Sequence, residues 1–292
     1  MRYLGQVIRP PSEAESLILQ VMYGCSHGDC AFCGSYLGKP FRVRPLAEIA
    51  DDIGRLPAGI KSATERVFLC DGDALAIPSR RMVDVLDLLA AELPRLSRVS
   101  AYANAHSLLR LSTDELHKIR SHGLELLYVG LESGDEATLA EMGKGVTAAQ
   151  QIEAFRLAKR AGYGLSVTAV LGLGGVERSF VHARSTGEAL SAIDPDYIGI
   201  LTLMLEPGTR LYDSVGRGDF VVPGPLQLLL ELRETIDACD VTHAVFRTNH
   251  ASNYLALRGT LPEDKVRLLR LLDDVLAAPE KARLKPDYLR GL

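Results

Sequence analysis

Hydrophobic positions along the chain form two alternating patterns, short apolar runs and longer stretches with helical spacing. The apolar runs have the length of buried strands, which we expect at residues 17–22, 67–70, 99–103, 126–129, 165–171 and 197–203. Helices are expected between them, at residues 45–56, 82–93, 112–123, 147–162 and 179–193. Strands that are almost wholly apolar and alternate with helices are typical of a parallel sheet covered by helices. The pattern therefore predicts an α/β fold.

Capping boxes mark the starts of two predicted helices. Ser112 is followed three residues later by Glu115, and Thr147 by Gln150. In such a pair each side chain accepts a hydrogen bond from a backbone N–H that the first helical turn leaves unpaired. We therefore expect helices to begin next to Ser112 and Thr147.

The pattern changes after residue 208. The elements expected beyond it are a helix, a strand and a second helix, near residues 225–239, 241–247 and 263–277. Connections between parallel strands are right-handed, so repeated winding curls a sheet toward a barrel. We expect a lead-in, a partial (βα)6 TIM-like barrel, and a C-terminal α/β extension that closes or caps it, over residues 1–16, 17–210 and 211–292.

Composition places the chain among globular proteins. Of 292 residues, 47% are apolar, and 33 basic against 37 acidic residues leave a net charge of −4. A chain of this size buries roughly 75% of its unfolded surface, which allows a large core. The high apolar content and low net charge exclude disorder. A dedicated nucleic-acid binder would carry a marked basic excess, which this chain lacks. No apolar run approaches the roughly 18 residues of a membrane span, and no secretory signal opens the chain, so we expect a cytoplasmic protein without a membrane partner.

Three of the five cysteines, Cys25, Cys30 and Cys33, fall within nine residues after the first predicted strand. Parallel α/β folds place their active sites at this end of the sheet. Iron–sulfur clusters usually take four cysteine ligands, so three would leave one iron open, as a catalytic metal site requires. A redox pair, or a structural zinc site that includes His27, stays an alternative. The corresponding alternative function is a non-catalytic iron–sulfur or zinc protein, an electron carrier or sensor.

The cysteine segment resembles the signature of the radical S-adenosylmethionine (radical SAM) enzymes. In that family three cysteines follow the first strand of a partial (βα)6 barrel, and an aromatic residue, here Phe32, precedes the last of them. The first gap has four residues here instead of the usual three. The resemblance covers residues 15–210 and implies that Cys25, Cys30 and Cys33 hold a 4Fe–4S cluster whose open iron chelates SAM.

The resemblance also implies the reaction. An electron from the cluster would cleave SAM to methionine and a 5′-deoxyadenosyl radical, which abstracts hydrogen from a small-molecule substrate. The enzyme would be an oxidoreductase in the broad sense, with a reductant such as flavodoxin or ferredoxin. The strand ends most resemble the group that contains coproporphyrinogen oxidases and Elongator-like enzymes. Only Cys70 and Cys239 remain for other roles, which indicates a single cluster.

Several strand ends carry the residue types that the family uses around SAM. The turn of Asp71, Gly72 and Asp73 lies where the family receives the SAM ammonium, and a carboxylate complements a cation. Glu132, in the family-like segment at 130–134, would contact the ribose hydroxyls or the methionine part. The adenine would pack beside the glycine-rich end of the fifth strand. By the resemblance the cofactor-binding residues are Phe32, Asp71, Gly72, Asp73, Asn104, Glu132, Gly172 and Gly174. Ordinary turns remain the alternative at each strand end.

Three further groups of polar residues lie outside those that the resemblance assigns to the cluster and SAM. The basic stretch at 39–44 either meets an anionic group or, as favoured, is solvated, and His182 and Arg184 are expected on a helix surface. A polar segment follows the strand near 241–247 and would lie over the barrel mouth if that strand extends the sheet. Its candidates for lining the substrate pocket are Asn249, His250, Asn253 and Tyr254. Helix capping and turn formation are the competing role.

Overall fold

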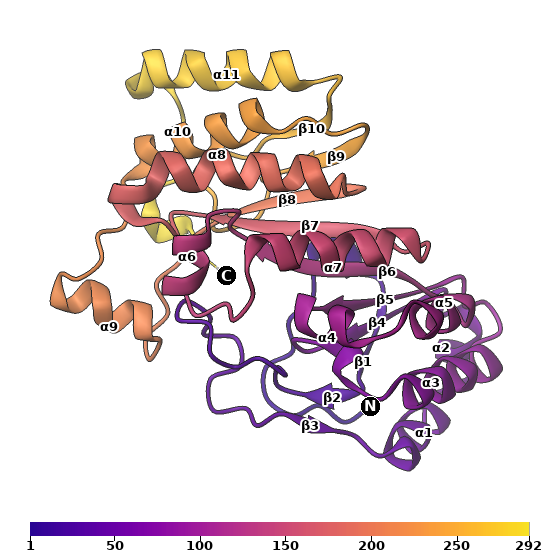
Figure 1. Ribbon diagram of the computed structural model, residues 1–292. Helices are drawn as coiled ribbons and strands as arrows, with labels where there is room; N and C mark the ends of the chain where they lie inside the picture. Colours follow the sequence, from indigo (N-terminus) through magenta and orange to yellow (C-terminus); the bar gives the residue numbers. More distant parts are fainter. Residues whose placement is uncertain (292) are drawn as a thin grey trace. The chain divides into compact units, whose positions relative to one another are not determined.

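The computed structural model describes residues 1–291, which form two compact units (Figure 1). Unit 1 consists of Met1–Gly28, Ser35–Val129 and Ala154–Leu165. Unit 2 consists of Asp29–Gly34, Gly130–Glu153 and the chain from Ser166 onward. The cysteine segment is therefore divided, with Cys25 in unit 1 and Cys30 and Cys33 in unit 2.

Unit 1 contains parallel strands that neighbour one another in the order β1, β4, β5, β6. They span Leu17–Gln20, Arg66–Cys70, Arg98–Ala103 and Leu124–Glu132. A short antiparallel ladder joins β2 (Met22–Tyr23) to β3 (Arg42–Val43). The helices are α1 (Leu46–Gly54), α2 (Ala58–Ala63), α3 (Ser79–Glu92), α4 (Ala105–Arg110) and α5 (Thr113–Ser121), with 3-10 turns η1 (Pro11–Glu13) and η2 (Ala74–Ala76). The end of β6 and the start of α7 (Ala148–Arg160) belong to unit 2.

Unit 2 continues with strands in the order β7, β8, β9, β10, of which the last is antiparallel to its neighbour. They span Gly164–Leu171, Tyr197–Thr202, Ala244–Arg247 and Arg258–Leu261. The helices are α6 (Glu136–Glu141), α8 (Gly175–Ile193), α9 (Arg210–Arg217), α10 (Pro225–Ala238) and α11 (Lys265–Ala277), with 3-10 turns η3 (Pro279–Lys281) and η4 (Asp287–Leu289). A Cβ at Gly187 would lie 2.5 Å from the carbonyl oxygen of Thr235, so this glycine lets α8 approach α10 closely.

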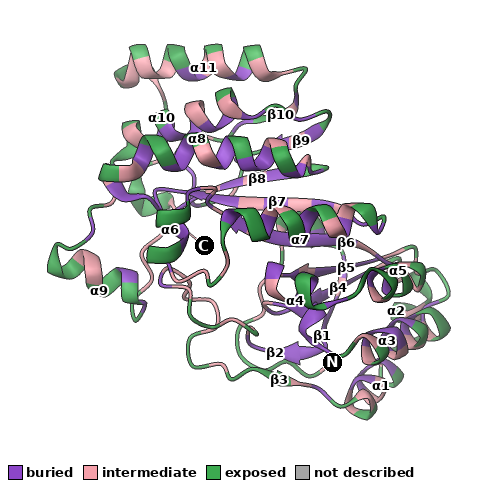
Figure 2. Cartoon of the chain, viewed as in Figure 1, coloured by how far each residue is buried: buried purple, intermediate pink, exposed green. Residues whose placement is uncertain are grey.

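The two faces of the strands in unit 2 differ in burial (Figure 2). Because side chains alternate along a strand, each strand contributes to both faces. One face is buried and apolar, with Val167, Ala169, Ile198, Ile200 and Phe246. The other face is mixed and more exposed, and its aligned residues are Thr168, Gly199, Arg247 and Arg258.

The predicted α/β alternation is confirmed, including the capping boxes of Ser112 with Glu115 and Thr147 with Gln150. The strand expected near 241–247 exists as β9 and extends the sheet beside β8. The strand expected at 17–22 is interrupted at Val21, because the chain leaves β4 after Gln20 and pairs with β3 instead. The short helices α2, α4, α6 and α9 were not predicted, because they span too few turns for a periodic apolar signal. The strands β3 and β10 were not predicted either, and each has only one large apolar side chain.

Within residues 1–291, no helix combines the length and the apolar character needed to cross a membrane.

Candidate functional site

Cys25 lies against the turn that follows β4. The N–H of Gly24 donates to Oδ2 of Asp71 over 2.9 Å, and the N–H of Gly72 donates to the carbonyl of Gly24 over 2.9 Å. A Cβ at Gly72 would lie 2.6 Å from Cβ of Cys25 and 2.7 Å from its Sγ. Only a glycine therefore leaves room for this cysteine. The structure brings Cys25 and the predicted turn of residues 71–73 together within unit 1.

The carboxylate of Asp71 is fully buried and has three partners in the chain. It accepts hydrogen bonds from Nε2 of Gln20 at 3.1 and 3.2 Å and from the N–H of Gly24, and it forms an ion pair with Nζ of Lys39 at 2.6 Å. The side chain of Lys39 is only 8% exposed. A solvated role, expected for the stretch 39–44, is therefore wrong for Lys39, because its ammonium neutralises a buried carboxylate.

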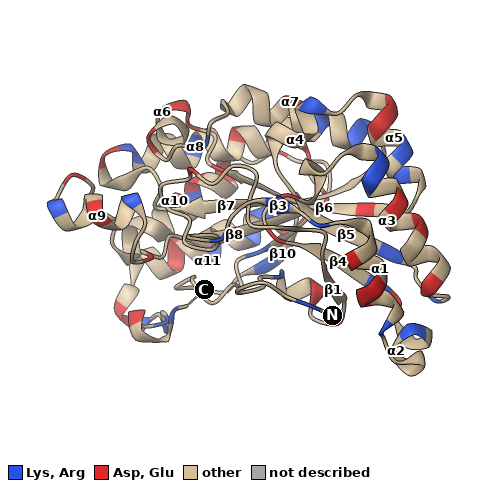
Figure 3. Cartoon of the chain, turned by 90° about the horizontal axis from the view of Figure 1, so that it is seen from below, with Lys and Arg blue, Asp and Glu red and all other residues tan. Residues whose placement is uncertain are grey.

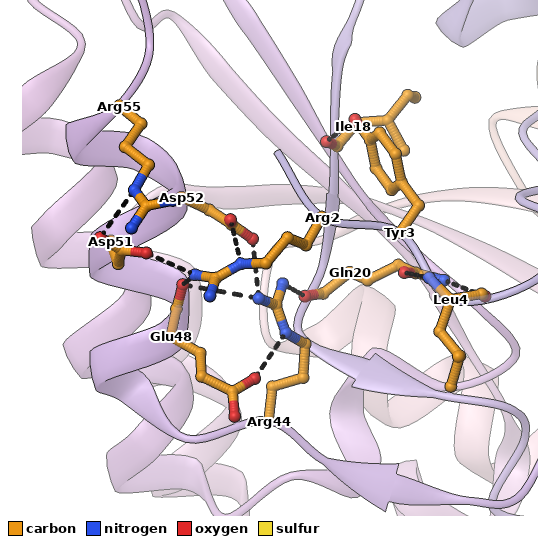
Figure 4. Close-up of polar contacts among 10 residues, drawn as sticks. All are labelled: Arg2, Tyr3, Leu4, Ile18, Gln20, Arg44, Glu48, Asp51, Asp52 and Arg55. Atoms are coloured by element: carbon orange, nitrogen blue, oxygen red, sulfur yellow. Dashed lines mark hydrogen bonds and ion pairs between the residues drawn. The ribbon is translucent and has the colours of Figure 1, made fainter.

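Arg44 also corrects that expectation (Figure 4). Its guanidinium is buried, donates to the carbonyl of Gln20 at 2.8 Å, and pairs with Oδ2 of Asp52 at 2.7 Å. Arg2 donates to the other oxygen of Asp52, also at 2.7 Å. Burial acts to raise the pKa of Asp52, but the hydrogen bonds from Arg44 and Arg2 outweigh it, so the pKa lies below its ordinary value. Lys39 and Arg44 are thus held in the interior by ion pairs, whereas Phe41 and Arg42 of the same stretch are exposed, as expected.

Asp73 organises the loop next to Cys25. Its carboxylate accepts hydrogen bonds from the hydroxyls of Ser26 and Ser107, each at 2.5 Å, and from the N–H of Asn104 at 3.3 Å. Burial nevertheless raises the pKa of Asp73 to about 6. The side chain of Asn104 caps α4 by accepting from the N–H of Ser107, and its amide donates to Ser26. Asn104 is thus close to the predicted turn, with its side chain engaged as a helix cap.

Cys30 and Cys33 lie in a short segment that backbone hydrogen bonds hold in unit 2. The N–H of Ala31 donates to the carbonyl of Met142 at 2.8 Å, and its carbonyl accepts from the N–H of Leu211 at 2.9 Å. Phe32 packs, partly buried, against an apolar cluster that consists of Ala31, Met142, Val170, Leu173, Leu203, Leu211 and Phe220. The aromatic residue between the two cysteines therefore anchors their loop in a core.

The charge of Glu132 acts on the thiol of Cys30. Burial raises the pKa of the Cys30 thiol to about 11, the charge of Lys144 lowers it, and that of Glu132 raises it. Lys144 pairs with Oε1 of Glu132 at 3.1 Å. A Cβ at Gly130 would lie 2.0 Å from that oxygen, so the glycine makes space for the carboxylate. The structure thus brings the predicted Glu132 close to Cys30. It also places Lys144 there, a cation that was not predicted from the sequence.

His182 connects the chain after β6 to the end of β7. Its Nδ1 accepts from the hydroxyl of Ser133 at 2.7 Å, and its Nε2–H donates to the carbonyl of Val170 at 3.1 Å. The side chain is 1% exposed, and burial lowers its pKa to about 4, so the ring is neutral. The expected surface position is therefore wrong for His182, whereas Arg184 is exposed as expected.

The glycine-rich end of β7 is held by a residue of α10. The N–H of Gly172 donates to Oε2 of Glu231 at 2.7 Å, and the hydroxyl of Ser179 donates to Oε1 at 2.6 Å. Glu231 is 2% exposed, and burial raises its pKa to about 7. Gly174, at the N-cap of α8, has no room for a side chain, since a Cβ would lie 2.9 Å from Cβ of His182. Glu231 was not among the predicted site residues. Its carboxylate lies within the apolar stripe of a helix, a position that indicates a buried polar contact.

The polar segment at 249–254 lies against the end of β8. The amide of Asn253 donates to the carbonyls of Ile200 and Thr248 at 2.7 and 2.9 Å and accepts from the hydroxyl of Thr202 at 2.7 Å. With these contacts the side chain of Asn253 holds the turn that follows β9 against β8. The hydroxyl of Tyr254 donates to Asp287, and Arg290 stacks on its ring. His250 is half-buried with Nδ1 at 2.9 Å from the hydroxyl of Ser252, and Asn249 is exposed.

No three His, Cys, Asp or Glu side chains in the described part of the chain are grouped in a way that could hold a metal ion.

A comparison with known protein families matches residues 19–185, more than half of the chain, to the radical SAM superfamily. An uncharacterized methyltransferase of Pyrococcus horikoshii is 27% identical over 201 residues, which are 67% of this chain and 41% of that protein. The mitochondrial radical S-adenosyl methionine domain-containing protein 1 of Bos taurus is 30% identical over 200 residues, 68% of this chain and 43% of that protein. The chain thus spans less than half the length of these relatives.

Solved structures share the fold. Methylornithine synthase has a TM-score of 0.55 at 17% identity, and the match covers 93% of this chain and 74% of the synthase. Coproporphyrinogen III oxidase from Escherichia coli, a radical SAM enzyme, has a TM-score of 0.55 at 16% identity. The match covers 76% of this chain and 51% of the oxidase. The α/β fold of parallel strands and helices is thus that of TIM-barrel-like enzymes, as predicted.

Proposed function

This chain belongs to the radical SAM superfamily, whose members are enzymes that use a 4Fe–4S cluster and SAM, and from this premise we propose that it abstracts a hydrogen atom from a small-molecule substrate. The observation that carries the proposal is the family match over residues 19–185, which contains the three clustered cysteines. An electron carrier or structural zinc protein has no comparable support.

The three cysteines are the proposed ligands of the cluster. Three thiolates are the donors that such a cluster requires. Gly72 supports this assignment, because a Cβ there would lie 2.7 Å from Sγ of Cys25 and would displace the thiol. When bound, the cluster and SAM supply the radical chemistry by reductive cleavage of SAM. The chain's own part is to hold these groups, orient the substrate and exclude water and oxygen.

We assign the contacts to SAM to the strand ends. At the turn after β4, the carboxylates of Asp71 and Asp73 already have partners in the chain. They would fix the backbone of the turn at Gly72, which we propose receives the SAM ammonium. The acidic side chain of Glu132 would accept hydrogen bonds from ribose hydroxyls or contact the methionine part, with Lys144 holding it in place.

The adenine of SAM is proposed to pack beside the turn of Gly172 and Gly174. This turn is positioned from two sides, by Glu231 through the N–H of Gly172 and by His182 through the carbonyl of Val170. Asn249 and His250 stay candidates for the substrate pocket, because their side chains are not engaged as fully as that of Asn253. Asn104 serves the turn of Asp73 instead, because its amide donates to the hydroxyl of Ser26, which in turn donates to Asp73.

The experiment is anaerobic reconstitution of the protein with iron and sulfide, followed by dithionite reduction and analysis of the products of SAM. We expect a brown protein with the electron paramagnetic resonance signal of a reduced 4Fe–4S cluster, and formation of 5′-deoxyadenosine. Cys25→Ala, Cys30→Ala and Cys33→Ala should each lose cluster and product. The matched control is Cys239→Ala, a buried cysteine outside the motif, which should keep both.

Two outcomes would contradict the proposal. A colourless protein, or one that holds zinc alone, would indicate the structural metal site. Formation of S-adenosylhomocysteine without 5′-deoxyadenosine would indicate polar methyl transfer, a reaction that the name of the Pyrococcus relative brings into consideration.

A further inference from the structure

Two arginines face each other across the β9–β10 ladder. Arg247 and Arg258 are directly opposite in the antiparallel register, and both are exposed. Directly opposite residues have Cβ atoms roughly 4.5–5.5 Å apart, and like charges in that arrangement destabilise the pair. The protein therefore retains a repulsive contact where almost any neutral residue would relieve it.

Neither guanidinium is neutralised by the surrounding chain. Across residues 1–291, no hydrogen bond or ion pair engages the side chain of Arg247 or Arg258. The acidic residue beside them, Asp264, already pairs with Nε of Arg267 at 2.8 Å and accepts from the N–H of Thr260 at 2.8 Å. The two positive charges are thus left available to a molecule from outside.

The arginines line an open hollow of about 410 Å³, which we call the arginine hollow. Its lining residues are Val245, Arg247, Arg258, Gly259, Thr260, Asp264 and Arg267. Three arginines and one aspartate give it a net charge of +2 (3 − 1). Figure 3 shows Lys and Arg in blue on β10 and α11, which frame it.

A glycine keeps the space beside the hollow open. Gly199 of β8 pairs with Arg247, and a Cβ there would meet only Oγ1 of Thr168, at 3.9 Å. Thr168, Gly199, Arg247 and Arg258 are aligned across four neighbouring strands on one face. Gly199 lies three residues before the end of β8, a distance of roughly 10 Å at 3.3 Å per residue. A ligand held by the arginines could therefore extend along this face toward the strand ends.

We propose that Arg247 and Arg258 bind an oxyanion, a phosphate or carboxylate group of the small-molecule substrate. Guanidinium groups offer paired donors that match such oxygens, and an anion between two of them relieves their repulsion. A charge on an edge strand also discourages strand pairing, but one residue suffices for that, and Lys is the usual choice. The assignment of the oxyanion to the substrate rests on the proposed function, whereas binding itself does not.

The test is titration calorimetry of the full chain at low salt with inorganic pyrophosphate as the phosphate probe and malonate as the carboxylate probe. We expect binding of at least one probe. Arg247→Gln and Arg258→Gln should each weaken it about tenfold or more, and the double variant should abolish it. The matched control, Arg270→Gln, removes an exposed arginine of α11 outside the hollow and should bind like the wild type. The probe that binds decides between phosphate and carboxylate.

Several results would overturn the proposal. These are no binding of either probe by the wild type, equal binding by the double variant, or tighter binding of a single-stranded oligonucleotide that the same variants abolish. If a glutamine variant fails to fold, Arg247→Lys and Arg258→Lys keep the charge but lose the paired donors, and should weaken binding less than glutamine does. Since calorimetry needs no SAM cleavage, failure here is distinguishable from absence of 5′-deoxyadenosine in the wild type.

Discussion

The ammonium nitrogen of Lys39 lies 2.6 Å from Oδ2 of Asp71, whose carboxylate is fully buried. The carboxylate belongs to the turn on which Cys25 rests, through the hydrogen bond from Gly24. Lys39, six positions after Cys33, therefore supports the backbone beside Cys25. The buried charge of Asp71 thus accounts for a cation at this position.

Replacement of Lys39 should destabilise the protein, because the buried carboxylate of Asp71 would lose its cation. Lys39→Met leaves a buried carboxylate without its cation, which we expect to lower the free energy of unfolding by about 3–5 kcal/mol. Chemical denaturation measures it. The control is Arg217→Met, whose exposed ion pair with Asp219 should be worth about 1 kcal/mol or less. A loss below that control would show that Lys39 does not stabilise the turn.

Gly72→Ala should impair cluster assembly. Its Cβ would lie 2.6 Å from Cβ of Cys25, so the cysteine must move from its position. We expect iron and sulfide contents after reconstitution to fall at least several-fold. Gly28→Ala, in the loop that carries the cysteines, is the control, because a Cβ there meets no atom within 4 Å. Equal iron contents in the two variants would contradict the packing argument.

Gly134→Ala should destabilise the fold. A Cβ at Gly134 would lie 2.0 Å from the carbonyl oxygen of Ser185, so α8 must shift. We expect a loss of about 1–3 kcal/mol or more in unfolding free energy. Gly216→Ala, in open space within α9, should instead gain about 0.5–1 kcal/mol, because alanine favours a helix. Thermal and denaturant unfolding measure both, and a neutral Gly134→Ala would refute the contact.

Glu231 should make stability depend on pH. Its folded pKa, about 7, is raised above the model-compound value of 4.5 by burial, so the folded state binds the proton more tightly than the unfolded state does. The resulting stability is fully present below pH 4.5 and is lost as the pH rises to about 7. At 1.36 kcal/mol per pKa unit the loss amounts to about 3 kcal/mol.

Glu231→Gln should remove this component of the pH dependence. Denaturation of the wild type and the variant between pH 4 and 8 measures the difference in unfolding free energy. We expect the wild type to lose about 3 kcal/mol more than the variant over this range. Glu188→Gln on the exposed face of α8 serves as control and should follow the wild type. Parallel curves for wild type and Glu231→Gln would show that the carboxyl group does not titrate in this range.

Local sequence determined the elements and the chemistry at their ends. The helix that follows Ser112 and the strand at Arg66–Cys70 depend on hydrogen bonds and apolar spacing within a few residues, and both were predicted correctly. The cysteine trio was visible because its members are close in the chain. The family resemblance needed only that motif and the order of the strand ends.

Tertiary structure alone decided which charges are buried and with whom. His182 was expected on a surface and lies in the core, and Lys39 was expected in solvent and neutralises Asp71. Glu231 meets Gly172 although 59 residues separate them. Helical spacing says which face of a segment is apolar but not which distant polar group will lie beside it. The free energy of a buried charge depends on that partner, so its role emerges only when the chain is folded.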